Sequence, residues 1–343
     1  FSWITASLVC LGLFTGADAP PGLNIYFVDV MGGAATLIVT PEKESLLIDT
    51  GWPGFEDRDP KRIIHVLKDV AGCDHLDHLL VTHWHMDHVG GVEGLAKRVE
   101  IRHFWDRGLP EDRLENVDFP DGPKDSDPLA VAYRKASAGK RRALKAGETF
   151  PLKGIEALVL ASSGCVMHSD SAPPNPLCAD APADQPVDNS DNARGVALKL
   201  KLGSFDFLDT ADITWNIEKQ MVCPRNLIGP IDLYQVAHHG MDISNHPTLL
   251  ATIAPTVSIM DNGPRKGGSA ATVKRLKALP SLKAAYQLHR NVQTSAEENT
   301  DPAYIANKDP EGGQFIQVNV KPDGTTFAVR IGTDGEARTF QSR

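Results

Sequence analysis

The sequence lacks several patterns that define common classes of protein. Its five cysteines include no pair at the Cys-x-x-Cys spacing of a structural zinc site. It has no Gly-x-Ser-x-Gly nucleophile motif, no P-loop and no Gly-x-Gly-x-x-Gly fingerprint. It also lacks a basic excess, since 44 acidic residues outnumber 35 basic ones and give a formal net charge of -9. These absences argue against serine-hydrolase, P-loop and Rossmann chemistry, and against a broad electrostatic grip on nucleic acid, which needs a basic face.

The bulk composition is typical of a soluble globular protein. The chain has 343 residues, of which 41% are hydrophobic and 23% charged, and this length allows one large domain or two modest ones. Two stretches rich in proline and acidic or small polar residues, 109–128 and 162–192, have the composition of loop insertions. We therefore interpret residues 20–343 as a single domain that carries these two insertions.

The N-terminal stretch FSWITASLVCLGLFTGADAP is apolar and too short to span a bilayer comfortably. It ends in Ala17-Asp18-Ala19, which is similar to the cleavage site of a secretory signal peptide, although no basic start precedes it. We interpret residues 1–19 as a signal peptide, with a buried N-terminal strand or helix as the alternative. The mature protein is then expected to be secreted or periplasmic and to have no membrane segment.

Export makes disulfides possible. Without Cys10, the remaining cysteines are Cys73, Cys165, Cys178 and Cys223, and four cysteines allow two disulfides in any of three connectivities. Cys165 and Cys178 flank a proline-rich loop and are the first expected pair, while free buried thiols are the alternative.

The stretch THWHMDHVGG concentrates potential metal ligands. It places His83, His85, Asp87 and His88 close together, directly after the apolar run DHLLVT, which has the length of a strand. Imidazole and carboxylate groups are the nitrogen and oxygen donors that zinc and similar ions use. Alternation along the loop would direct His83 and His85 to one side and Asp87 and His88 to the other. The pattern predicts two adjacent metal sites.

This His-x-His-x-Asp-His loop, followed by small residues, resembles the hallmark of the metallo-β-lactamase superfamily. Short β-rich runs and helical patterns follow one another along the chain, and they include hairpins around residues 203–204 and 322–324. Residues 130–147 are predicted to form a basic, alanine-rich helix. The resemblance implies an α+β fold, the αβ/βα four-layer sandwich, in which two sheets face each other with helices outside.

The resemblance implies further metal ligands. The family carries a bridging aspartate after a hairpin, commonly in a Thr-Gly-Asp pattern, and the run TAD offers Asp212, with Asp209 as the nearby rival. The family also carries a histidine before a glycine at a strand end. Here YQVAHHG offers His239 as the expected ligand and His238 as a residue that supports the ligands or faces the substrate. The doubled histidine is similar to the branch that includes competence proteins and phosphocholine esterases.

One expected ligand is missing. Where the family usually has a His-x-x-Gly pattern, this chain has the run NARG beginning at Asn192, and asparagine is a poor zinc ligand. The first site is then expected to hold His83, His85 and Asp212 with water, or to recruit His168 from the long loop. We place Asn192 among the expected substrate-binding residues.

A glycine-rich turn adds a candidate anion site. The run DNGPRKGGS, residues 261–269, places Arg265 and Lys266 between glycines, after an expected strand and before an expected helix. Two cations and the amides of a helix N-terminus would bind a substrate anion there. A solvated turn is the alternative reading.

Together these features predict an exported, metal-dependent hydrolase. The resemblance implies two divalent ions, with zinc as the expected metal and manganese as the alternative. It also implies a metal-bridging hydroxide that attacks the substrate, with Asp87 and His238 in catalytic roles. The expected metal ligands are His83, His85, Asp87, His88, Asp212 and His239. We expect a phosphodiester or another small molecule as substrate, and no strong nucleic-acid-binding surface. The alternatives are lactonase or β-lactamase activity and a non-catalytic metal-binding module.

Overall fold

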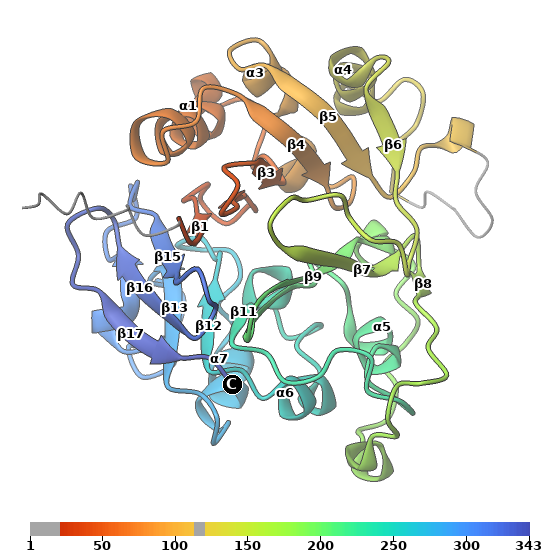
Figure 1. Cartoon of the computed structure of the whole chain (residues 1–343), viewed down its shortest axis with the longest axis vertical. Helices are drawn as coiled ribbons and strands as arrows, with labels where there is room; N and C mark the ends of the chain where they lie inside the picture. Colours follow the sequence, from red (N-terminus) through yellow and green to blue (C-terminus); the bar gives the residue numbers. More distant parts are fainter. Residues whose placement is uncertain (1–20, 113–120) are drawn as a thin grey trace, which may run out of the picture.

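The computed structural model of the protein describes residues 21–112 and 121–343. The predicted signal peptide, residues 1–19, and part of the first predicted insertion lie outside the described residues. Two β-sheets pack face to face and helices cover their outer surfaces, so the predicted four-layer sandwich is confirmed (Figure 1). Within the described ranges, no helix is both long and apolar enough to cross a membrane.

The first sheet contains both ends of the described chain. Its nine described strands run in the order β17-β16-β15-β1-β2-β3-β4-β5-β6. They are β1 (Leu23–Phe27), β2 (Thr36–Val39), β3 (Ser45–Ile48), β4 (Leu76–Val81), β5 (Ile101–Asp106), β6 (Arg141–Ala143), β15 (Ile316–Val320), β16 (Thr326–Ile331) and β17 (Arg338–Gln341). Strands β1 to β3 form an antiparallel meander, whereas β3 to β6 run parallel to one another.

The second sheet carries the other half of the sandwich. Its eight described strands run in the order β14-β13-β12-β11-β10-β9-β7-β8. They are β7 (Glu156–Ser162), β8 (Cys165–Val166), β9 (Ala197–Leu202), β10 (Phe205–Asp209), β11 (Leu233–Gln235), β12 (Val257–Met260), β13 (Ala284–His289) and β14 (Ile305–Asn307). Strands β9 and β10 form the predicted hairpin, and β10 to β14 run parallel.

A hydrophobic core fills the space between the sheets. The rings of Phe27 in β1 and Phe207 in β10 meet edge to face with centroids 6.1 Å apart, and both side chains are fully buried. Burial of one such side chain contributes roughly 1.5–3 kcal/mol. Because alternate residues of each strand point into this core, their neighbours point outward and need a cover of helices.

Two groups of helices provide that cover, and Figure 1 shows them on opposite sides of the sandwich. The first sheet packs against α1 (Arg58–His65), α3 (Val92–Ala96) and α4 (Pro128–Ser137). The second sheet packs against α5 (Trp215–Gln220), α6 (Pro247–Ile253) and α7 (Ala270–Lys277).

Two local predictions are wrong. The helix predicted over residues 130–147 ends at Ser137, because Gly139 takes a left-handed conformation (φ 73°) and the following residues join the first sheet as β6. The expected pairing of Cys165 with Cys178 is also wrong, because Cys178 is bonded to Cys223. The side chain of Asn175 donates to the carbonyl of Val222 at 2.9 Å, which holds the long loop against the segment that carries Cys223.

The parallel strands position the site. In a parallel sheet the carboxyl ends of the strands meet at one edge, where loops from different strands come together. Such loops follow strands in both sheets here, and they bring together Asp49 after β3, His83 after β4, Asp212 after β10, His239 after β11 and Asp261 after β12.

A buried carboxylate in α5, Glu218, leads to a prediction of pH-dependent stability. Glu218 accepts hydrogen bonds from the amides of Asn245 (2.9 Å) and His246 (2.8 Å), and burial raises its pKa from 4.5 to about 7. Between these pH values the folded protein holds a proton that the unfolded chain has released, so this group's contribution to stability falls as the pH rises. We expect Glu218→Gln to gain about 3 kcal/mol of unfolding free energy relative to wild type between pH 4.5 and pH 8. Urea unfolding of both proteins at the two pH values measures this difference, and parallel pH profiles would contradict it.

Candidate metal centre

The histidine-rich loop turns into a short helix, α2 (Met86–Val89), directly after β4. This turn brings Asp87 and His88 to the same place, with their Oδ2 and Nε2 atoms 3.4 Å apart. The two glycines that follow permit close approach, since a Cβ atom at Gly90 would collide with Pro53 and one at Gly91 would collide with the backbone of Thr50. The small residues of the motif are therefore needed for packing beside the ligands.

The second histidine segment has an unusual backbone. His238, His239 and Gly240 all lie in the left-handed region, with φ values of 54°, 52° and 80°. This conformation is costly for residues with a Cβ atom and is found mainly where function requires it. It turns both imidazoles toward Asp212, to which their Nε2 atoms lie at 3.5 Å (His238) and 3.3 Å (His239).

Asp212 lies at the centre of the site. The preceding residue, Ala211, has a φ of 47°, which accounts for the glycine that the family commonly has there. The Oδ2 atom of Asp212 lies 3.2 Å from Nε2 of His88 and 4.0 Å from Nε2 of His83. Together with the doubled histidine, four imidazoles from two loops face one carboxylate oxygen.

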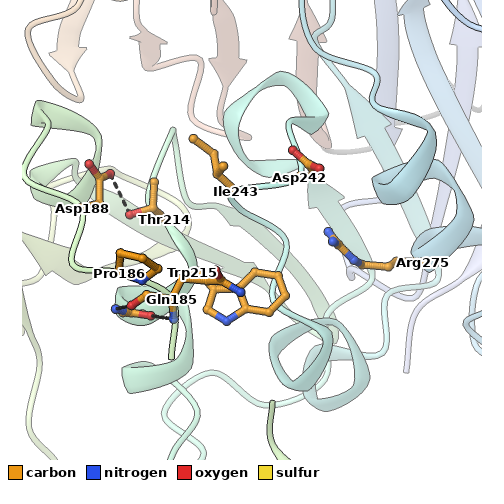
Figure 2. A pocket seen from close by; sticks show the side chains of 9 residues that line it. Gln185, Pro186, Asp188, Thr214, Trp215, Asp242, Ile243 and Arg275 are labelled. Carbon is orange, nitrogen blue, oxygen red and sulfur yellow. Dashed lines mark hydrogen bonds between the residues drawn. The ribbon is translucent and has the colours of Figure 1, made fainter. Parts of the chain in front are cut away.

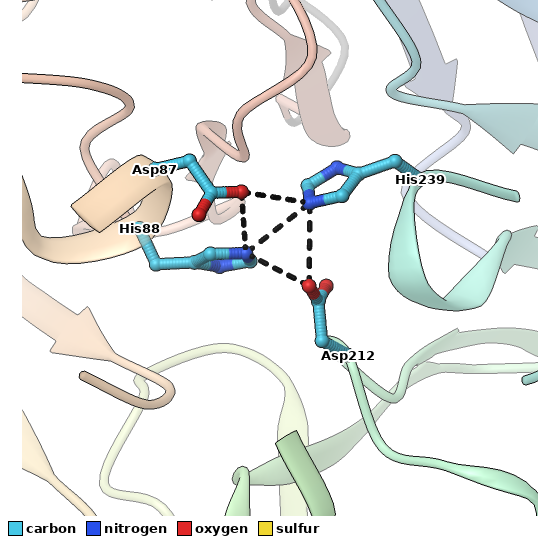
Figure 3. Close-up of side chains that lie close together, drawn as sticks. All are labelled: Asp87, His88, Asp212 and His239. Atoms are coloured by element: carbon cyan, nitrogen blue, oxygen red, sulfur yellow. Dashed lines mark hydrogen bonds and ion pairs between the residues drawn. The ribbon is translucent and has the colours of Figure 1, made fainter. Parts of the chain in front are cut away.

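Four of these residues form a compact set of donors, shown in Figure 3. Each of four buried residues contributes one ligand atom, and these atoms all lie within 4.8 Å of one another. The residues are Asp87, His88, Asp212 and His239. Two imidazole nitrogens and two carboxylate oxygens are a donor set that suits zinc or a similar divalent ion.

The electrostatics of the cluster favour a bound cation. Burial opposes charge on each group, yet the imidazoles of His239, His88 and His238 hold the pKa of Asp212 well below its usual range. Burial likewise opposes the charged form of His88, but the carboxylates of Asp212, Asp87 and Asp49 raise its pKa well above the ordinary value. The carboxylates thus stabilise positive charge at this point, and the residues fit a divalent metal ion.

Carboxylates lie behind both histidine ligands. The Oδ2 atom of Asp49 is hydrogen-bonded to Nδ1 of His88 at 2.7 Å, whereas Oδ1 of Asp261 lies 3.3 Å from Nδ1 of His239 with no hydrogen bond between them. A proton on Nδ1 of His88 leaves its Nε2 lone pair directed into the cluster, which is the arrangement found behind metal-bound histidines. The sequence reasoning missed both carboxylates, although each is the first aspartate after an apolar strand.

The Asp49 contact leads to a prediction. We expect Asp49→Asn to weaken metal binding by about 10- to 100-fold, because the uncharged amide holds the His88 ring less firmly. Competition between the protein and a chromogenic chelator measures this affinity. Asp77→Asn is the matched control. Asp77 accepts a hydrogen bond from the amide of Ser45 (2.9 Å), but it lies at the start of β4, whereas the histidine-rich loop follows the end of that strand. Equal affinities of the Asp49 variant and wild type would contradict the role of Asp49.

The other predicted ligands lie beside this cluster. Nε2 of His83 is 3.1 Å from Nδ1 of His85, and Nε2 of His85 is 2.9 Å from Oδ2 of Asp121. Asn192 is buried, and its Nδ2 lies 3.4 Å from Nε2 of His238. Of these two histidines only His83 approaches Asp212, at 4.0 Å, and among the described residues the one compact donor set is that of Asp87, His88, Asp212 and His239.

Of the four remaining residues that the sequence offered as substrate-binding residues or metal ligands, some lie at the site and others lie away from it. The ammonium of Lys266 contacts Oδ2 of Asp87, whereas Arg265 is exposed and does not line the cavity that contains the cluster. Asp209 accepts a hydrogen bond from the amide of Ala211 and is not in the four-residue cluster. The side chain of His168 is 82% exposed and lies 3.0 Å from Asp170. Its exposure gives no support to the expected recruitment of His168 as a ligand.

Two cavities adjoin the loops of the site. The larger, about 670 Å³, opens over the cluster and includes Asp87, Asp212, His238 and Lys266 in its walls. The other, about 450 Å³, has no wall residue in common with the first, and Figure 2 shows Trp215 and Arg275 at its side. Of these two cavities, only the larger is lined by residues of the cluster.

Comparison with known proteins agrees with this geometry. Residues 28–180, which contain the histidine-rich loop, match the family described as the metallo-beta-lactamase superfamily. Over these residues the chain is similar to that superfamily, as its motif predicted.

Two curated proteins are similar in sequence. ComE operon protein 3 of Bacillus subtilis is 22% identical over 254 residues, which are 70% of this chain and 28% of that protein. The beta-lactamase-like protein 2 homolog of Caenorhabditis elegans is 30% identical over 69 residues, 20% of this chain and 22% of that protein. The matches therefore span about a quarter of the length of these relatives. The predicted resemblance to the superfamily and to its competence-protein branch is confirmed.

Solved structures that align with the chain include the metallo-beta-lactamase fold protein YhfI of Bacillus subtilis. It aligns with a TM-score of 0.46 at 11% identity, over 77% of this chain and 95% of that one. The diiron beta-hydroxylase CmlA of Streptomyces venezuelae aligns with a TM-score of 0.39 at 14% identity, over 71% of this chain and 45% of that one.

Proposed function

We propose that the protein is a metal-dependent hydrolase that acts on a phosphodiester. The observation that carries this proposal is the convergence of four imidazoles on Oδ2 of Asp212, with the carboxylate of Asp87 in the same compact donor set. The tight cluster of Asp87, His88, Asp212 and His239 would hold one divalent ion, and His83 and His85 would help to hold a second. Such ions would supply a Lewis acid and would lower the pKa of a bound water.

Lys266 supports an anionic substrate. Its ammonium lies in the wall of the cavity and contacts Asp87, so it would neutralise an oxygen of a phosphodiester bound over the cluster. The amide of Asn192 lines the same cavity and would donate a hydrogen bond to the substrate.

His238 supports a role in proton transfer. Its Nδ1 atom lies 3.2 Å from the hydroxyl of Ser244, and its Nε2 atom faces Asn192 and Asp212 at the cavity wall. A ring held in this way would present Nε2 to the substrate and would hold or release a proton there. Asp87, in contact with both the cluster and Lys266, would orient the reacting groups.

The experiment that tests the proposal combines metal content with a panel of substrates. Elemental analysis of the purified protein is followed by assays with bis-p-nitrophenyl phosphate, a simple lactone and nitrocefin. We expect bound metal and chelator-sensitive hydrolysis of the phosphodiester. Hydrolysis of the lactone or nitrocefin alone would replace the phosphodiester with those substrates. Bound metal without any turnover would favour the metal-binding module.

A variant of Lys266 refines the test. Because a methionine side chain is close to lysine in length but carries no charge, Lys266→Met should lower kcat/KM for the anionic phosphodiester by about tenfold, equivalent to ~1.4 kcal/mol of transition-state stabilisation. Arg265→Met is the control, since Arg265 is exposed and lies outside the cavity wall. An equal loss in both variants would mean that only general charge attraction is at work.

We also propose that the protein works in an oxidising compartment outside the cytosol. The disulfide between Cys178 and Cys223 supports this proposal, because structural disulfides persist mainly in such compartments.

A further inference from the structure

The cavity over the metal cluster is lined by apolar as well as charged side chains. Six of its lining residues are apolar, and together we call them the apolar wall: Trp52, Pro53, Trp84, Met86, Pro128 and Leu129. The charged and ligating residues lie in the same cavity of about 670 Å³. A ligand that fills the cavity therefore meets charge at the cluster and hydrocarbon beside it.

Three separate segments build this apolar wall. Trp52 and Pro53 follow β3, Met86 begins α2, and Pro128 and Leu129 form the first turn of α4. The amide of Trp52 donates to Asp59 at 2.8 Å, which fixes the loop that carries the indole. The wall is thus part of the folded framework of the site.

Met86 is an exposed apolar side chain between two predicted metal ligands. It stands between His85 and Asp87 in the sequence, and it is 54% exposed. A large apolar side chain that remains in water costs free energy, and a flexible thioether adapts to ligands of different shape. The ammonium of Lys266 lies 4.8 Å from the centre of the Trp52 ring, so the cation of the site is in contact with the apolar wall.

The charges in the cavity limit what else could occupy it. Asp121 and Asp127 line the cavity together with Lys266, and the whole chain has a net charge of -9. A second phosphate next to the reacting one would be repelled by these two carboxylates. A polyanion such as nucleic acid is therefore a poor match, whereas a single anionic group with a hydrocarbon substituent suits both parts of the cavity.

We propose that the substrate is an amphiphilic phosphodiester, with its charged group at the metal cluster and Lys266 and with an alkyl or aryl ester group against Trp52, Met86 and Leu129. This inference rests on the phosphodiesterase function proposed above and specifies its substrate class. Each methylene that moves from water onto the apolar wall should strengthen binding by up to roughly fourfold.

The test compares p-nitrophenyl phosphodiesters that carry a methyl or an octyl group, at concentrations where both are monomeric. We expect kcat/KM to be at least about 30-fold higher for the octyl ester, a small part of the maximum that seven extra methylenes could contribute. Met86→Ser should reduce this octyl-to-methyl ratio about tenfold, and Met86→Leu should preserve it. Val131→Ser is the matched control, because Val131 is 50% exposed on α4 but lies outside the cavity wall.

The outcomes separate this inference from the function on which it rests. An octyl preference that is lost in Met86→Ser and kept in Met86→Leu and Val131→Ser supports it. Equal hydrolysis of the two esters by wild type, or an equal fall of the ratio in Met86→Ser and Val131→Ser, overturns the inference and leaves the phosphodiesterase function standing. Absence of hydrolysis of either ester and of bis-p-nitrophenyl phosphate by metal-loaded protein overturns the function, and the substrate class with it.

Discussion

Replacement of Asp212 by asparagine is expected to remove most of the bound metal and to lower kcat/KM by about 10³-fold, since metal catalysis contributes several kcal/mol. The reason is that one oxygen, Oδ2 of Asp212, faces the Nε2 atoms of His83, His88, His238 and His239. An uncharged amide in its place would leave these imidazoles without their shared anion, and it is a poor ligand. Elemental analysis and steady-state kinetics measure the two effects.

His168→Asn is the matched control for this experiment. His168 is a histidine that the sequence offered as an alternative ligand, but its side chain is 82% exposed and lies beside Asp170 in the long loop. It should keep wild-type metal content and activity. Full metal occupancy in Asp212→Asn would refute the central position of Asp212, and loss of metal in His168→Asn would restore His168 as a ligand.

Removal of the disulfide is expected to lower the unfolding free energy by about 4 kcal/mol, through the loop-closure entropy that the crosslink takes from the unfolded chain. Cys178 and Cys223 are 45 residues apart in the sequence, so the crosslink closes a long loop. The double variant Cys178→Ser/Cys223→Ser removes it while keeping side chains of similar size. Urea unfolding of the variant and wild type under non-reducing conditions measures the difference.

The free thiols provide the control for this prediction. Cys73 is half-buried and Cys165 is exposed, and neither is bonded to another cysteine of the described chain. The double variant Cys73→Ser/Cys165→Ser should unfold close to the wild-type midpoint, within about 1 kcal/mol. If the Cys178/Cys223 variant were equally stable, native packing of the long loop alone would hold it in place.

The local pattern of the sequence predicted much of the fold. Strand-length apolar runs ended at turns, as at Gly203-Ser204, and these hairpins formed as expected. Strands such as β14 (Ile305–Asn307) and β17 (Arg338–Gln341) were missed. Each is short and lies at the edge of a sheet, so it depends on a distant partner more than on its own pattern.

The residues of the candidate site also include some that the sequence predicted and others that it missed. The loop carrying His83, His85, Asp87 and His88 was visible in the sequence because its donors are neighbours along the chain. Asp49 and Trp52 were missed, since nothing in their local sequence indicates that they approach His88 and Lys266.

By itself, the sequence determined the histidine-rich loop and the family resemblance that rests on it, because the residues concerned are close together in the chain. The four-layer fold class followed from that resemblance. The sequence already favoured His239 over His238 as a ligand, and His239 lies in the tight cluster. Only the tertiary structure decided that Cys178 pairs with Cys223 and that Lys266 reaches Asp87. Each of these facts depends on how separate loops meet, for example across the 179 residues between Asp87 and Lys266. Such contacts follow from the packing of whole sheets and helices, which no local pattern encodes.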